Sequence, residues 1–180
     1  NSVIYCFLGL YTVHYFNRTI IFPFRLKLKI KKIPLHIVFS AALFNLINTF
    51  FLGYYFGSIK IYQENWLTTP YFIIGIIIFF IGMLINLQSD NILISLRKRN
   101  KEEYGIPNGG LFKYVSCPNH LGEIIEWLGF AILTWSFAGF SFFIWTACNL
   151  IPRSTKHHDW YINKFKNYPK NRKVIIPFIW

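Results

Sequence analysis

Two groups of polar side chains flank a strongly apolar stretch in the second half of the chain, each spaced as one face of an α-helix requires. The first group precedes the stretch and comprises Asn119, Glu123 and Glu126. The second follows it and comprises Arg153, His157 and Tyr161. Ionisable groups are costly beside hydrocarbon and persist there mainly where they bind something. We therefore expect the active site at the mouth of this apolar stretch.

The second group suits a phosphorylated ligand. A guanidinium such as that of Arg153 pairs with two phosphate oxygens at once, while imidazole and phenol donate hydrogen bonds or stack. The alternative is a solvated basic tail that touches lipid headgroups. For the first group, the alternative is a helix N-cap at Asn119 followed by acidic residues in the first turn. That alternative accounts for one carboxylate more readily than for two.

A third group closes an earlier apolar run. Asn86 and Asp90 lie four residues apart and Arg97 lies seven further on, so a helix would place all three on one face. The alternative is an ordinary polar helix end with an ion pair.

The first apolar run closes with His14, Tyr15 and Arg18. A tyrosine at that depth is either an interfacial anchor or a hydrogen-bond donor to a carbonyl inside the helix bundle.

Neither a metal site nor a Rossmann site is expected. His157 and His158 are adjacent and point to different faces of a helix, and neither HExxH nor a cysteine pair accompanies them. Gly109 and Gly110 do not complete GxGxxG, and no strand and helix pattern surrounds them. The three cysteines form an odd set without paired spacing, so we expect no disulfide.

The composition is that of an integral membrane protein. Of the 180 residues, 54% are hydrophobic and 21% aromatic, whereas only 14% are charged. A formal net charge of +12 could indicate nucleic acid, but the cations lie in loops between apolar runs and no nucleic-acid motif occurs. We expect one all-α membrane domain over residues 1–180 and no nucleic-acid partner.

The apolar runs predict about five transmembrane helices. Residues 2–16, 35–57 and 69–87 come close to the roughly 20 residues that a spanning helix needs. Residues 124–151 would measure about 42 Å as one helix, which exceeds the roughly 30 Å hydrocarbon core. We therefore expect two short helices there, with a break in the region 136–139.

Charge placement predicts the orientation, because cytoplasmic loops collect Lys and Arg. All basic residues except Lys60 fall in the loops 17–33 and 88–118 or in the tail from 152, which we expect on the cytoplasmic side. Aromatic and basic residues alternate over 159–168, which predicts an interfacial amphipathic segment. The chain begins inside an apolar run with neither a signal nor a transit pattern, so we expect a fragment that has lost an upstream segment.

Four separated motifs occur in order along the chain. They are HYFNRTIIFPFRLK at 14–27, GMLINLQSDNILISLRK at 82–98, GGLFKYVSCPNHLGEIIEWLGFAILTWSFAGFSFF at 109–143 and NLIPRSTKHHDWYINKFKNYPKNRKVIIPFIW at 149–180. The last two resemble the C-terminal half of steroid 5α-reductases, closest to the plant type of brassinosteroid synthesis, and the first two extend the resemblance over essentially the whole chain. It implies a multi-pass, all-helical, NADPH-dependent reductase of the endoplasmic reticulum membrane, with seven helices in the intact family. We expect a monomer.

The resemblance also implies roles for individual residues. Tyr15 matches the tyrosine that hydrogen-bonds the ketone of a 3-oxo-Δ4 steroid, while the family's partner glutamate lies upstream on a helix that this chain does not contain. Such a hydrogen bond would draw electrons from the conjugated alkene, so that the β-carbon accepts hydride from NADPH. The residues implied to line the NADPH site are Asn86, Asp90, Arg97, Tyr104, Asn119, Glu123, Arg153, His157 and Tyr161.

Three alternatives stay open. A trans-2-enoyl-CoA or polyprenol reductase of the same superfamily would share the hydride chemistry. An isoprenylcysteine-type membrane methyltransferase would bind S-adenosylmethionine in place of NADPH. A non-catalytic sterol-binding or scaffold protein would need no catalytic glutamate.

Overall fold

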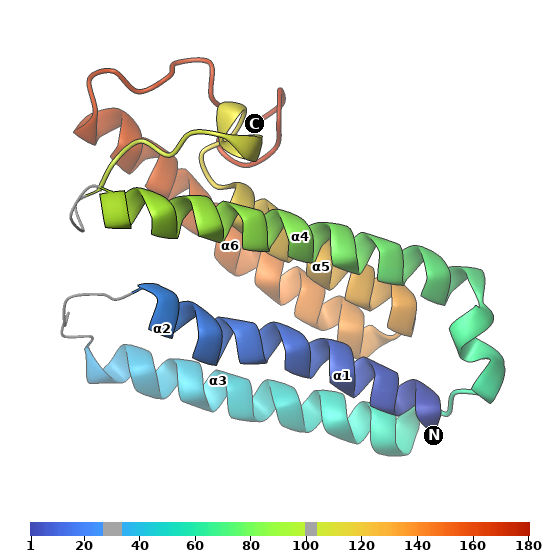
Figure 1. Ribbon diagram of the computed structural model, residues 1–180. Coiled ribbons are helices and arrows are strands. Elements are labelled where there is room, and N and C mark those ends of the chain that lie inside the picture. Colours follow the sequence, from blue (N-terminus) through green and yellow to red (C-terminus); the bar gives the residue numbers. More distant parts are fainter. Residues whose placement is uncertain (27–33, 100–103) are drawn as a thin grey trace.

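The computed structural model describes residues 1–26, 34–99 and 104–180, and over these residues the regular elements are helical (Figure 1). The N-terminal part contains α1 (Ser2–Phe16), a π-helical turn (Asn17–Ile21), α2 (Phe22–Leu26), α3 (Leu35–Tyr54) and a second π-helical turn (Tyr55–Ile59). A 3-10 turn (Glu64–Thr68) leads into α4 (Pro70–Arg99). A further 3-10 turn (Gly110–Lys113) precedes α5 (Pro118–Thr134) and α6 (Phe137–Lys164).

The predicted break between two C-terminal helices is confirmed, but the expectation that both are short is wrong for α6, which has 28 residues. Trp135 adopts a left-handed backbone with φ of 41°, and Ser136 begins α6 by accepting a hydrogen bond from the Gly139 amide at 3.0 Å. The helix predicted over 69–87 is longer than expected, because α4 continues to Arg99.

The predicted interfacial segment over 159–168 is not a separate element. Helix α6 continues past Pro152 to Lys164, and Tyr161 is buried, with its ring stacked 5.4 Å from that of Tyr168. The chain after Lys164 turns back, and Lys173 donates its amide hydrogen to the Tyr114 carbonyl at 2.8 Å.

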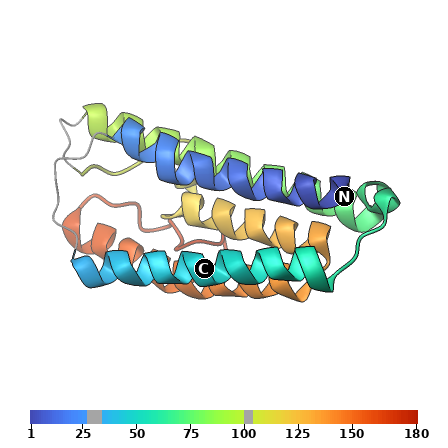
Figure 2. The ribbon, with the colours of Figure 1, turned by 90° about the horizontal axis from the view of Figure 1, so that it is seen from below.

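The helices lie lengthwise beside one another (Figures 1 and 2). The ends of α2, α4 and α6 and the start of α3 gather at the same end of the bundle. Within the described residues, two segments are long and apolar enough to cross a membrane, Leu35–Ile59 and Pro70–Arg97.

Helices α4 and α5 are in backbone contact through glycines. A Cβ atom added to Gly82 would lie 2.2 Å from the Glu126 nitrogen, and one added to Gly129 would lie 2.3 Å from the Phe79 nitrogen. Small residues let membrane helices approach this closely. The two helices therefore form a platform on which side chains have fixed relative positions.

The C-terminal end of α5 is capped by side chains from the loop before α4. Tyr62 donates to the Thr134 carbonyl at 2.7 Å, Trp66 donates to the Leu133 carbonyl at 2.9 Å, and Lys60 donates to the Trp135 carbonyl. The last carbonyls of a helix lack intrahelical partners, which is costly near a membrane. Burial lowers the pKa of the Lys60 ammonium group.

Helices α1 and α3 pack more loosely. Helix α1 enters the core through Val3 and Phe7, whose ring lies 5.0 Å from that of Tyr62. Helix α3 buries only Leu52 and touches α6 through the stacked rings of Phe44 and Trp145, 4.5 Å apart.

Candidate active site

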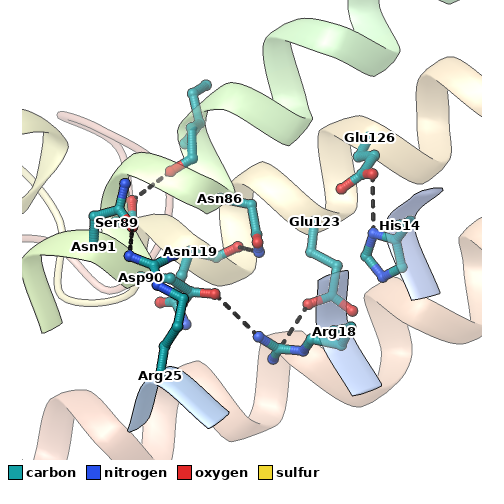
Figure 3. Close-up of polar contacts among 11 residues, drawn as sticks. His14, Arg18, Arg25, Asn86, Ser89, Asp90, Asn91, Asn119, Glu123 and Glu126 are labelled. Carbon is teal, nitrogen blue, oxygen red and sulfur yellow. Dashed lines mark hydrogen bonds and ion pairs between the residues drawn. The ribbon is translucent and has the colours of Figure 1, made fainter. Parts of the chain in front are cut away.

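The platform of α4 and α5 positions the first polar residues of the site. The buried Asn86 side chain donates from Nδ2 to the Asn119 carbonyl at 2.9 Å, which ties α4 to the first turn of α5 (Figure 3). The helix N-cap is Cys117, so the alternative interpretation of Asn119 as a helix cap is wrong. The Asn119 backbone instead serves as an acceptor for α4.

Arg18, in the π-helical turn after α1, bridges to both helices of the platform (Figure 3). Its Nη1 lies 3.2 Å from Oδ2 of the buried Asp90, and its Nη2 lies 3.7 Å from Oε2 of Glu123. Asp90 Oδ1 and Glu123 Oε2 are buried and lack hydrogen-bond partners in the described structure. Asp90 therefore pairs with another helix, and the interpretation of an ion pair at its own helix end is wrong.

A second bridge lies further along the same helices. Nδ1 of His14 is 2.9 Å from Oε1 of Glu126, and the His14 ring meets the Trp127 ring edge-on at 4.7 Å. Tyr15 is half-buried next to this bridge, with its ring 4.6 Å from Tyr11 and 6.1 Å from Trp127. The predicted ketone donor thus lies among aromatic side chains.

A cavity of about 420 Å³ opens between the C-terminal ends of α4 and α6 and the start of α5. Arg97 lines it and stacks on the Tyr104 ring at 5.1 Å. The lining includes four of the predicted cofactor residues besides Arg97, which are Tyr104, Asn119, His157 and Tyr161. Trp160 adds a further aromatic face.

The other predicted cofactor residues lie outside the lining of this cavity. Asn86, Asp90 and Glu123 form the cluster around Arg18. Arg153 is exposed, one helical turn before His157. Along α4 the polar face from Asn86 to Arg97 extends over about 16 Å at the rise of an α-helix, which suits an elongated ligand.

The sequence predicts no role for Arg18 or His14, although both lie close to Tyr15 in the chain. Their partners lie 72 and 112 residues away in the chain. The sequence analysis also predicted no cofactor-binding role for His120, whose Nδ1 lies 2.8 Å from Ser154 Oγ and which lines the cavity. Among the described residues, no group of three or more His, Cys, Asp and Glu side chains is arranged to hold a metal ion.

The residues present fit a phosphorylated dinucleotide. Arg97 supplies a cation for phosphate, while Tyr104, Trp160 and Tyr161 supply flat faces for a base. Asp90 Oδ1 and Glu123 Oε2 make no hydrogen bond in the described structure, so as acceptors they can receive hydrogen bonds from amide and ribose hydroxyl groups.

A family model described as 3-oxo-5-alpha-steroid 4-dehydrogenase matches residues 31–180. The chain belongs to this family. The name describes an oxidoreductase, which confirms the predicted enzyme class. Family membership also agrees with the resemblance found in the sequence motifs.

Individual relatives of the 3-oxo-5-alpha-steroid 4-dehydrogenase family cover nearly the whole chain. Steroid 5-alpha-reductase DET2 of Solanum lycopersicum is 45% identical over 100% of this chain and 71% of its own length. Steroid 5-alpha-reductase DET2 of Arabidopsis thaliana is 46% identical over 94% of this chain and 68% of its own length. The 3-oxo-5-alpha-steroid 4-dehydrogenase 1 of Bos taurus is 41% identical over 96% of this chain and 66% of its own length. The chain thus spans about two thirds of the length of these relatives.

Proposed function

We propose that the protein reduces the conjugated carbon–carbon double bond of a 3-oxo-Δ4 steroid or sterol-like lipid, with NADPH as the reductant. The observation that carries this proposal is the run of polar residues along α4 and α5, which leads from the cavity at Arg97 to the aromatic surroundings of Tyr15. Family membership supports the choice of substrate, because the relatives carry the names of steroid reductases.

Two parts of the site would hold the cofactor. Arg97 and the exposed Arg153 would bind its phosphates, and Tyr104, His157 and Tyr161 would contact the adenosine end. The second part comprises Asn86, Asp90, Asn119 and Glu123, whose amide and carboxylate groups would bind the other end. A reduced nicotinamide bound by these residues would supply hydride to the β-carbon of the enone.

Tyr15 would donate a hydrogen bond to the ketone oxygen of the substrate. This bond stabilises the negative charge that develops on that oxygen as the β-carbon gains hydride. The α-carbon then takes a proton from water to complete the saturated ketone. The rings of Tyr11, Trp127 and Phe142 would form apolar walls that exclude bulk water from the β-carbon while hydride is transferred.

We propose further that residues 1–180 form a single membrane domain, with α1, α3, α4, α5 and α6 crossing the bilayer of the endoplasmic reticulum. The basic loops would lie on the cytoplasmic side, where a soluble cofactor is available. A lipid-like substrate would enter from the bilayer, and the protein would act as a monomer.

Turnover of the full-length protein in lipid vesicles tests this function. With NADPH and a 3-oxo-Δ4 steroid, we expect cofactor oxidation and a saturated 3-ketone as product. Tyr15→Phe should lower kcat by about 10²-fold to 10³-fold, the usual cost of removing one donor to a developing oxyanion. Tyr5→Phe is the matched control, because Tyr5 lies on the same helix but is exposed.

Three results would contradict the proposal. They are no turnover with any enone lipid, full activity of Tyr15→Phe, and binding of S-adenosylmethionine in place of NADPH. Preference for an enoyl-CoA or a long-chain polyprenal would assign the same hydride chemistry to another substrate.

A further inference from the structure

The hydrogen bond between His14 and Glu126 is buried deep in the bundle and has no part in the reaction as proposed above. Glu126 is 0% exposed and His14 is 6% exposed, and their side chains meet at 2.9 Å. The other carboxylate oxygen, Oε2 of Glu126, is buried without a hydrogen-bond partner in the described structure. A buried polar group in this state is costly.

Stability alone does not explain this pair. A buried ionisable pair can often be replaced by apolar side chains of similar volume at no cost or with a gain in stability. His14 packs against aromatic rings, with the Trp127 ring at 4.7 Å and the Tyr15 ring at 5.3 Å, and the charged groups of the Arg18 cluster are already paired with one another. An apolar pair would therefore suit the same location.

The pair does, however, connect a fixed element to a loosely packed one. The backbone at Glu126 is held against α4 by Gly82, where a Cβ atom would lie 2.2 Å from the Glu126 nitrogen. His14 belongs to α1, whose described ties to the platform at this end are side-chain bridges (Figure 3). Tyr15 is the next residue along α1, so the rotation of the helix that satisfies His14 also sets the direction of Tyr15.

We propose that His14 and Glu126 are positioning residues that fix α1 in the rotation that points Tyr15 at the substrate ketone. This inference rests on the proposed function, because it takes Tyr15 as the donor to the ketone. It predicts that the loss of the pair lowers kcat while leaving the binding of NADPH and steroid nearly unchanged.

The critical variant is the double substitution His14→Phe with Glu126→Leu, in the full-length protein in lipid nanodiscs. His14→Phe alone keeps a ring beside Trp127 but leaves Glu126 buried and unpaired, so it could unfold the protein. The double variant removes the carboxylate as well, and we expect its thermal stability to equal or exceed that of the wild type. We expect its kcat to fall by about 10-fold to 100-fold, since a misplacement near 1 Å has such an effect.

Two further variants separate positioning from stability. Glu126→Gln keeps an acceptor for the His14 N–H. Its kcat should stay within about 3-fold of the wild-type value, because the hydrogen bond and its geometry persist. Thr134→Val removes a buried hydroxyl that donates to the Phe130 carbonyl at 2.8 Å, at the opposite end of α5 from its first turn. This control should lower thermal stability without changing kcat. A double variant as stable and as active as the wild type would overturn the proposal.

A measurement without turnover makes the test independent of the proposed function. With 3-fluorotyrosine incorporated at position 15, the ¹⁹F resonance should shift or broaden in the double variant and stay unchanged in Thr134→Val. An unchanged resonance in the double variant would overturn the positioning role even if the enzyme is active. If the wild type reduces no enone but the resonance moves as expected, the proposed function fails while the mechanical link between the pair and Tyr15 stands.

Discussion

Replacement of Gly82 by alanine tests the rigidity of the platform on which the site depends. The new methyl group would lie 2.2 Å from the Glu126 nitrogen and 2.6 Å from the Gly122 carbonyl oxygen, whereas ordinary contacts of a Cβ atom begin near 3.4 Å. The neighbouring atoms belong to the backbone, so no side chain can rotate away. Helices α4 and α5 would have to separate locally by about 1 Å, which typically costs ~1–3 kcal/mol.

The separation would also reach the site. The bond from Asn86 Nδ2 to the Asn119 carbonyl measures 2.9 Å and would exceed the hydrogen-bond range after such a shift. Alanine recovers at most about 1 kcal/mol through its better helix propensity. We therefore expect a net loss near 1–2 kcal/mol, or a decrease in Tm of roughly 2–8 °C for a protein of this size, together with weaker NADPH binding.

Thermal unfolding in detergent, followed by tryptophan fluorescence, measures this effect. Gly9→Ala is the matched control, because Gly9 lies in α1 and a Cβ atom there would meet nothing within 4 Å. We expect Gly9→Ala to leave Tm unchanged or to raise it by the gain in helix propensity. Equal Tm and equal NADPH affinity for Gly82→Ala and Gly9→Ala would refute the close contact of α4 with α5.

Two further predictions concern the cavity and the cap of α5. Arg97→Leu should raise the dissociation constant of NADPH by about 10-fold or more, since a charge-assisted bond to phosphate is worth roughly 1.5–3 kcal/mol. A fluorescence titration measures this constant, and Lys113→Leu is the control because Lys113 is exposed. Affinity unchanged by Arg97→Leu would place the phosphates elsewhere. Tyr62→Phe should lower the free energy of unfolding by about 1 kcal/mol through loss of the 2.7 Å bond to the end of α5, with kcat unchanged. A large fall in kcat for Tyr62→Phe would show that this cap also shapes the active site.

Much of the helical layout follows from the sequence because it depends on local properties. The break at Trp135 was predictable, since the apolar stretch is too long for one crossing and contains Ser136 and Gly139. The C-terminal end of α6 was harder to predict, because the polar residues after Pro152 are typical of a surface segment. The burial of Tyr161 depends on Tyr168, which reaches it only after the chain turns back.

In the candidate site too, the contacts within one helix were predictable and the contacts between distant parts of the chain were not. Asn86, Asp90 and Arg97 share α4, so helical spacing alone groups them. The bridges from His14 and Arg18 join residues 72 to 112 positions apart, and no local pattern reports such pairs. The acidic and basic residues of these pairs can be identified in the sequence, but only the packing of α1 against the platform shows which of them form pairs.

The fate of the hydride tests the central claim most directly. The full-length protein should be incubated with a 3-oxo-Δ4 steroid and NADPH that carries deuterium at the transferable position of the nicotinamide, and the product analysed by mass spectrometry and NMR. We predict one deuterium at the former β-carbon and an intact 3-ketone. Deuterium on a newly formed carbinol carbon, or a product without deuterium, would contradict the account.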